Sequence, residues 1–349
     1  LLHNSLQQTY ARAAIICFPM SDSNVFRFVL FAGALAFSAS VAAVDEEFVR
    51  DCVAAAAKTQ DDDVTLGTLR QNCIKQALFA EQYPSERRYA IERKTAAEPF
   101  VMTPHRPNYL ILASFNAEEY NETPFVQQLG ADAEGFEKLE AKFQISIKSS
   151  IADDVWRDGD GFFVGYTMRA FWQVWEDNGL SKPFRDYNHE PEVWYSAPIR
   201  WNFPGYRVSA LRLGLNHQSN GRGGSLSRSW NRFFGQFLFE RENAALGVMF
   251  WSRFHEDFDE DDNPDITDYL GNFELQAVYK RDGHTIGLMV RNNLDWDNNH
   301  GAYQLDWSFP LYKRMRGYVQ WFNGYGESLI DYNSRVNTIG FGIQLTDWL

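Results

Sequence analysis

From Asn108 to its last residue, the chain alternates apolar and polar residues in segments of about ten, separated by polar loops. The segment 139–148 reads LEAKFQISIK, with an apolar residue at every odd position. The last segment, 336–347, reads VNTIGFGIQLTD and repeats the pattern up to the end of the chain. Side chains two apart on a strand point to the same face, so each predicted strand has one apolar and one polar face.

This pattern predicts an all-β fold, a twelve-stranded antiparallel transmembrane β-barrel. A soluble β-sandwich alternates in the same way, but the aromatic content of 16% and an apparent export signal favour the membrane barrel. An even number of strands leaves both ends of the barrel domain in the periplasm, so odd-numbered strands run outward. The twelve predicted strands are 108–116, 138–148, 161–175, 190–200, 207–218, 230–240, 244–255, 269–280, 284–292, 301–309, 316–323 and 336–347.

The amino-terminal part of the chain has the pattern of an export signal. The one long apolar run, 28–43, follows Arg27 and ends in small residues, as a secretory signal does before its cleavage site. A single membrane anchor is the weaker interpretation, because the run is short. Residues 20–43, which begin at Met20, are therefore predicted to be a signal peptide, and residues 1–19 to be translation from a start placed too far upstream.

Residues 44–83 are predicted to form a small helical periplasmic extension. Of the three cysteines, Cys17 precedes the predicted cleavage site, which leaves Cys52 and Cys73 as a pair in an exported protein. We expect a disulfide between them. Residues 84–107 then form a linker to the barrel domain, 108–349.

Composition excludes two broad classes of protein. The net charge of −13 argues against nucleic-acid binding, which needs a basic surface to neutralise phosphates. The mean hydropathy of −0.41 excludes a bundle of membrane helices.

The segment 211–231, LRLGLNHQSNGRGGSLSRSWN, carries the candidate chemistry. His217 and Ser219 share odd parity with the leucines before them, so they lie on the apolar face of their strand. On the next strand Asn231 shares parity with Phe233 and Phe237. The three polar residues therefore meet on an outward, lipid-facing surface, and a lipid substrate is expected.

These residue types fit a serine hydrolase. A serine hydroxyl needs a base within hydrogen-bond reach, and histidine titrates in the right range, so Ser219 is the predicted nucleophile and His217 the base. The carbonyl of Asn231 would hold the other ring nitrogen without burying a charge near lipid. The chain contains no G-x-S-x-G or H-E-x-x-H motif.

Four blocks in order, NHQSNGR at 216–222, SRSWNR at 227–232, DDNPDIT at 261–267 and NGYGESLIDYN at 323–333, resemble the outer-membrane phospholipase A family of Gram-negative bacteria. The resemblance covers about residues 86–349. It implies a twelve-stranded barrel in the outer membrane that hydrolyses acyl esters of phospholipids, with A1, A2 and lysophospholipase activity. It also implies a requirement for calcium, a homodimeric active state and a site at the outer leaflet.

Residue by residue, the resemblance gives Ser219, His217 and Asn231 the same roles. It implies a catalytic calcium ion held by Ser227, by Ser181 of the partner subunit and by Arg222, whose only acceptor is its backbone carbonyl. This calcium and the amide of Gly221 would stabilise the oxyanion. Asp262 matches a carboxylate that binds a second calcium ion in the family. The residue that usually binds this ion together with it is replaced by Gly224 in this chain.

A non-catalytic barrel, either a narrow pore or a scaffold, is the competing hypothesis. The functional groups of a pore should point into the lumen, whereas this trio is predicted to point outward. Four interior polar residues are expected to fill a small lumen: Arg212, Arg232, Gln236 and Glu240. Two other groups have the ordinary interpretation of rim or loop residues: the acidic run 257–262, apart from Asp262, and the histidines His189, His255, His284 and His300.

Overall fold

The structure is a computed structural model, and it describes residues 46–57, 65–82, 102–130, 135–175, 183–203, 205–257, 261–313 and 315–346. The predicted upstream segment, the predicted signal peptide and most of the predicted linker lie outside these ranges. So does Ser181.

Two helices precede the barrel, α1 (Glu46–Ala56) and α2 (Leu66–Gln82). A disulfide joins Cys52 of α1 to Cys73 of α2 with a Cα–Cα distance of 5.8 Å, which confirms the predicted pair. The half-buried side chains of Val53 and Ile74 pack around the disulfide. In the part of the chain that the structure describes, we find no helix with the length and apolar character needed to cross a membrane.

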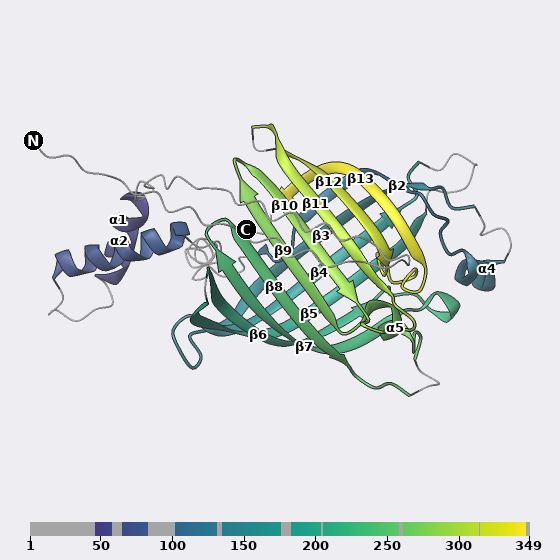
Figure 1. Cartoon of the computed structure of the whole chain (residues 1–349), viewed down its shortest axis with the longest axis horizontal. Coiled ribbons are helices and arrows are strands. Elements are labelled where there is room, and N and C mark those ends of the chain that lie inside the picture. Colours follow the sequence, from purple (N-terminus) through teal and green to yellow (C-terminus); the bar gives the residue numbers. More distant parts are fainter. Residues whose placement is uncertain are drawn as a thin grey trace, which may run out of the picture. The chain divides into compact units, whose positions relative to one another are not determined.

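The described strands form one closed antiparallel barrel of twelve, coloured from teal to yellow in Figure 1. Each strand pairs with its sequence neighbours, and pairing of the last strand, β13, with β2 closes the ring. A two-residue strand, β1 (Thr103–Pro104), adds to β3. The twelve are β2 (Asn108–Asn116), β3 (Leu139–Asp153), β4 (Gly161–Trp172), β5 (Phe184–Phe203), β6 (Tyr206–Ser219), β7 (Ser229–Arg241), β8 (Ala244–Arg253), β9 (Phe273–Arg281), β10 (His284–Asn292), β11 (Gly301–Tyr312), β12 (Met315–Tyr325) and β13 (Arg335–Thr346).

The predicted all-β barrel with twelve strands is confirmed, but three boundaries were wrong by four or more residues: the end of β3 and the starts of β5 and β9. The strand predicted over 190–200 is β5, which begins at Phe184. Its first residues include Arg185, Asp186 and Asn188, each at most 1% exposed inside the barrel. Because buried charged residues resemble a polar loop in sequence, this start was missed, and His189 belongs to a strand.

The two ends of the barrel differ. At one end, which we call the turn end, only two residues separate the strands of each of four pairs: β5 and β6, β7 and β8, β9 and β10, and β11 and β12. At the opposite end, the loop end, the described parts of the longer connections include short helices, two of which are labelled in Figure 1. The short helices are α4 (Thr123–Leu129), the 3-10 helix η2 (Gly224–Leu226) and α5 (Ile266–Leu270). The connection from β6 to β7 lies at the loop end.

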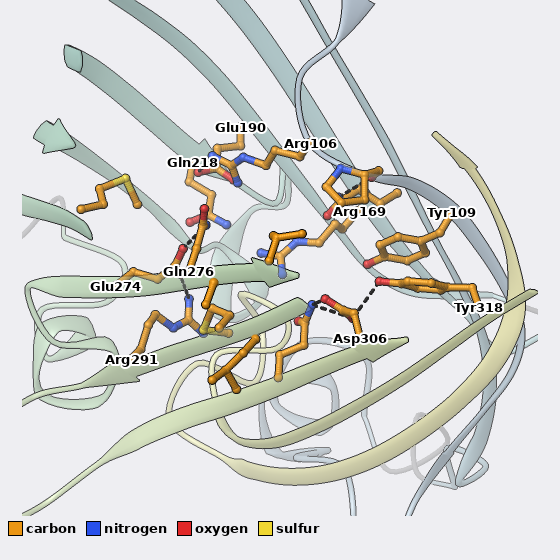
Figure 2. A pocket seen from close by; sticks show the side chains of 18 of the residues that line it. Arg106, Tyr109, Arg169, Glu190, Gln218, Glu274, Gln276, Arg291, Asp306 and Tyr318 are labelled. Carbon is orange, nitrogen blue, oxygen red and sulfur yellow. Dashed lines mark hydrogen bonds and ion pairs between the residues drawn. The ribbon is translucent and has the colours of Figure 1, made fainter. Parts of the chain in front are cut away.

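Polar side chains fill the lumen, as predicted. Arg232 and Glu240 are less than 10% exposed there, and Arg212 donates to Gln236. The Glu190 carboxylate accepts from Arg106 at 2.8 Å and from Arg232 at 3.1 Å. Arg106, Glu190 and Arg232 are among the residues that line a cavity of about 90 Å³, and Figure 2 shows Glu190 and Arg106 on one side of it. A lumen filled by buried ion pairs does not form a wide channel.

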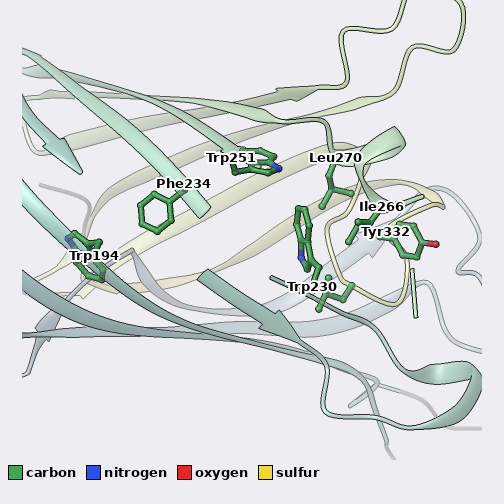
Figure 3. Packing of buried hydrophobic residues seen from close by; sticks show 8 residues of the cluster. Trp194, Trp230, Phe234, Trp251, Ile266, Leu270 and Tyr332 are labelled. Carbon is green, nitrogen blue, oxygen red and sulfur yellow. The ribbon is translucent and has the colours of Figure 1, made fainter. Parts of the chain in front are cut away.

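An apolar cluster packs inside the barrel near the loop end. Trp230 and Phe234 of β7 and Trp251 of β8 point inward (Figure 3). There they pack with Ile266 and Leu270 of α5 and with Tyr332 from the loop before β13. Trp230 is fully buried. The cluster therefore fixes the wall of the barrel next to Asn231.

Candidate active site on the outer face of the barrel

His217 and Asn231 lie opposite each other on β6 and β7. Asn231 Oδ1 is 2.8 Å from His217 Nδ1, a hydrogen bond on the outer face of the barrel. Since the amide oxygen can only accept, the ring nitrogen donates, and His217 Nε2 is left as an acceptor. The structure thus brings together the predicted base and its orienting amide in the arrangement a general base requires.

Ser219 lies two residues after His217 on the same outward face, at the end of β6. Its cross-strand neighbours are Ser229 on β7 and His189 on β5. Among the described residues, no hydrogen bond joins the Ser219 hydroxyl to the His217 ring. In enzymes without substrate, catalytic hydrogen bonds are often long and tighten when substrate binds.

Gly221, two residues after Ser219, has a φ of +63°, in the left-handed region that favours glycine. It is exposed. A Cβ built on it would be 3.9 Å from the ring of His189, so the Gly221 backbone lies beside the β5 neighbour of Ser219.

The buried residues behind the trio hold it in register. Gln218, between the base and the nucleophile, accepts a 2.9 Å hydrogen bond from the indole of Trp230. Arg232 donates to Asn216 at 3.1 Å, and its guanidinium lies 4.0 Å from the centre of a Trp230 ring. Since alternate residues of a strand face opposite sides, these inward contacts restrain the outward side chains next to them.

Asn220 organises the loop between β6 and β7. It is buried, and its side chain donates to the carbonyl of Leu226 at 2.8 Å. Its amide oxygen accepts from the backbone of Arg222 at 3.3 Å and of Arg228 at 3.0 Å. One side chain therefore shapes the whole glycine-rich turn that follows the predicted nucleophile.

Two of the predicted calcium ligands lie together. The Ser227 hydroxyl donates to Asp262 Oδ2 at 2.5 Å, so residues that the resemblance assigned to two calcium positions are in direct contact. The Arg222 guanidinium donates to the carbonyls of Phe184 and Arg185 at 2.8 and 2.9 Å. The Arg222 side chain is thus held by hydrogen bonds to β5. Its backbone carbonyl is the only oxygen with which Arg222 could bind calcium.

Gly224, the residue in place of the usual partner of Asp262, lies against α4. A Cβ on Gly224 would be 2.7 Å from the amide oxygen of Gln128. The turn is therefore packed too closely for a larger side chain without movement of Gln128.

No group of three or more histidine, cysteine, aspartate or glutamate side chains that could hold a metal occurs in the described ranges. The donors present are the Ser227 hydroxyl, one exposed carboxylate at Asp262 and the Arg222 carbonyl. All are oxygen ligands, the type that calcium prefers. The residues fit a calcium site built mainly from neutral oxygens.

Two polar side chains beside the trio had no predicted role: His189 was interpreted as a rim or loop residue, and Glu256 was not singled out. His189 lies opposite Ser219, and its Nδ1 is 2.6 Å from the Tyr166 hydroxyl. Its odd parity, shared with Val193 and Tyr195, would have placed it on the outward face had β5 been extended. Glu256 follows β8 and accepts a 3.1 Å hydrogen bond from the amide of Asn231. Only the fold brings it there.

Comparisons with known proteins, by family, sequence and structure, all identify phospholipases. The model of the family "Phospholipase A1" matches residues 85–345. The phospholipase A1 of Klebsiella pneumoniae is 34% identical over 256 residues, which cover 71% of this chain and 84% of that protein.

Two solved structures superpose with a TM-score of 0.66 at 31% identity, and each covers 72% of this chain. One is an active-site mutant of outer membrane phospholipase A from Escherichia coli, with an asparagine changed to alanine, of which 95% is covered. The other is the Salmonella typhi outer membrane phospholipase, a dimer with bound calcium, of which 94% is covered.

Proposed function

Because this chain belongs to the phospholipase A1 family and is a phospholipase of the outer membrane, we propose that it hydrolyses acyl esters through Ser219, His217 and Asn231. The observation that carries the proposal is the 2.8 Å bond between His217 and Asn231 on the outward face. The active site of the E. coli relative also contains an asparagine. The functional groups of a pore would instead face the lumen.

The surroundings of the trio suit a lipid substrate. Leu215 and Phe233, which flank it on β6 and β7, are 46% and 45% exposed on the outer face. The outer face of a membrane barrel meets acyl chains directly. In our proposal the loop end faces the cell exterior, so a phospholipid in the outer leaflet reaches Ser219 without leaving the bilayer.

The proposed reaction has two stages. Ser219 Oγ attacks the ester carbonyl while its proton passes to His217 Nε2, and Asn231 stabilises the resulting imidazolium through Nδ1. The proton then moves to the alkoxide of the departing lysophospholipid, leaving an acyl-serine. In the second stage a water attacks the acyl group while its proton passes to His217, and this proton then moves to Ser219 Oγ as the fatty acid leaves.

We place the amide of Gly221 at the developing oxyanion, since this residue follows the nucleophile closely and its backbone is exposed. A calcium ion, when bound by Ser227 and the carbonyl of Arg222, would supply positive charge to the same oxyanion. Asp262, which accepts from Ser227, would bind calcium at the second position. The Salmonella typhi relative is a dimer with bound calcium, which supports the same cofactor and a homodimer here. The contribution of Ser181 from the partner subunit is part of the proposal.

The test is release of fatty acid from phospholipid in detergent micelles, measured with calcium and with a chelator. We expect calcium-dependent release by the wild type and its loss in Ser219→Ala. Ser225→Ala is the matched control, because Ser225 lies in the same loop and donates to the carbonyl of Pro124. Full activity of the Ser219→Ala variant would rule out this nucleophile.

Cross-linking in the same micelles tests the homodimer. We expect activity to rise with the cross-linked fraction, and Ser181→Ala to raise the calcium concentration needed for half-maximal activity. A monomeric preparation with full activity would contradict the proposed partner contribution.

A further inference from the structure

The side-chain amide of Asn231 is held from both sides. Its oxygen faces His217 at 2.8 Å, and its nitrogen donates to Glu256 Oε1 at 3.1 Å. Glu256 lies just after β8, and its side chain is 20% exposed. Ser219, His217 and Asn231 therefore form a row of polar side chains, and the carboxylate of Glu256 is the next group in that row.

This contact selects one orientation of the amide. An asparagine side chain can present either its oxygen or its NH₂ group to a neighbour, and only the oxygen can accept from a histidine N–H. A carboxylate has no hydrogen to donate, so it accepts only from the NH₂ group. A carboxylate at Glu256 therefore turns the Asn231 oxygen towards His217 Nδ1, which leaves Nε2 free to take the serine proton.

The backbone and an arginine hold Glu256 in place. The amide of Phe254 donates to the carbonyl of Asn231 at 2.9 Å, which continues the pairing beyond the end of β8. Arg253 Nη2 is 3.7 Å from Glu256 Oε2 and 2.5 Å from Asp261 Oδ1. The arginine balances part of the negative charge, so a carboxylate near lipid is tolerated.

The same loop also reaches the candidate calcium ligands. Asn263 Oδ1 accepts from the backbone of Ser229 at 2.9 Å, and Asp262 contacts Ser227. Residues that follow β8 therefore contact both the Asn231 amide and the candidate calcium ligand Ser227.

We propose that Glu256 is a positioning residue that acts through Asn231 to fix the tautomer and orientation of His217. The inference rests on the proposed function, because it assigns a role only if His217 is the base for Ser219. The proposal adds Glu256 to the trio. The spacing of these residues in the sequence does not predict that Glu256 lies beside Asn231.

The first experiment compares Glu256→Ala and Glu256→Gln with the wild type by measuring kcat and KM. Positioned acid–base groups contribute about 10²–10⁴ in rate, and we expect Glu256→Ala to lose about tenfold or more in kcat with little change in KM. The carbonyl of Glu256→Gln can still accept from Asn231, so this variant should recover most of the loss. Asp257→Ala, one exposed carboxylate further along, is the matched control and should behave as wild type.

The second experiment is a double-mutant cycle with Asn231→Ala. If Glu256 acts through Asn231, Glu256→Ala should change kcat less than about twofold once Asn231 is removed. Undiminished loss in that background would overturn the inference, as would wild-type activity of Glu256→Ala or a Glu256→Gln variant no better than alanine. Ser219→Ala separates the two claims, because its full activity would refute the proposed function before Glu256 is considered.

Discussion

The indole of Trp230 donates a 2.9 Å hydrogen bond to Gln218 inside the barrel, directly behind the His217–Asn231 pair on the outer face. The two pairs lie on adjacent positions of the same two strands. The inner contact therefore couples the packing of the loop end to the position of the imidazole.

Removal of this indole should affect both stability and activity. Trp230 is fully buried, and replacing a buried tryptophan by alanine lowers the free energy of unfolding by about 3–5 kcal/mol. We expect Trp230→Ala to unfold at lower urea concentration in detergent and to lose kcat. Trp201→Ala is the control, because Trp201 is 68% exposed. Equal stability of the two variants would contradict the packing described here.

Changes at Asn231 should depend on whether an acceptor remains. Asn231→Ala leaves the His217 Nδ1 proton without a partner, and we expect kcat to fall about 10²-fold or more. Asn231→Asp keeps an acceptor, so it should retain more activity than the alanine variant, although its carboxylate now faces Glu256. Steady-state kinetics in micelles provide the comparison. An alanine variant as active as the aspartate variant would show that the hydrogen bond is not used.

Asp262 should determine the amount of calcium that is needed. Asp262→Asn keeps the size of the side chain and removes its charge, so calcium binding should weaken about tenfold, equivalent to about 1.4 kcal/mol. The measurement is the calcium concentration for half-maximal activity. Asp297→Asn, an exposed carboxylate in the β10–β11 loop, is the control. An unchanged calcium requirement in Asp262→Asn would exclude this residue from the metal site.

The buried pair Lys142–Glu327 offers a test of the lumen. The two charged atoms are 2.5 Å apart, and their side chains are 2% and 5% exposed. Lys142→Met leaves an unpaired buried carboxylate, which costs about 3–5 kcal/mol. The double variant Lys142→Met with Glu327→Gln should recover part of this loss in urea unfolding. If the double variant is no more stable than the single one, the pair is not coupled as described.

Much of the fold could be predicted from local alternation. Strand β10 was predicted at its observed bounds, 284–292, and its burial alternates over residues 284–288. Parity alone also predicted that His217 and Asn231 share the outward face. Both inferences need only neighbouring residues, which is why they were accurate.

The inner contacts could not be predicted in the same way. Lys142 and its partner Glu327 are 185 residues apart in sequence, and no local pattern indicates such a pairing. Glu256 stands next to an acidic run that reads as a solvated loop, yet the pairing of β7 with β8 brings it to Asn231. The helices α4 and α5 are too short for a helical period to be visible.

The most direct test of the central claim is to identify the residue that an alkyl sulfonyl fluoride modifies in the folded barrel. Such reagents react with a serine activated by a neighbouring base. Mass spectrometry of the digested protein should locate the adduct on Ser219, and the labelling rate should fall in His217→Ala and Asn231→Ala. An adduct on another residue, or hydrolysis that continues while Ser219 is fully labelled, would contradict an outward-facing Ser219–His217–Asn231 active site.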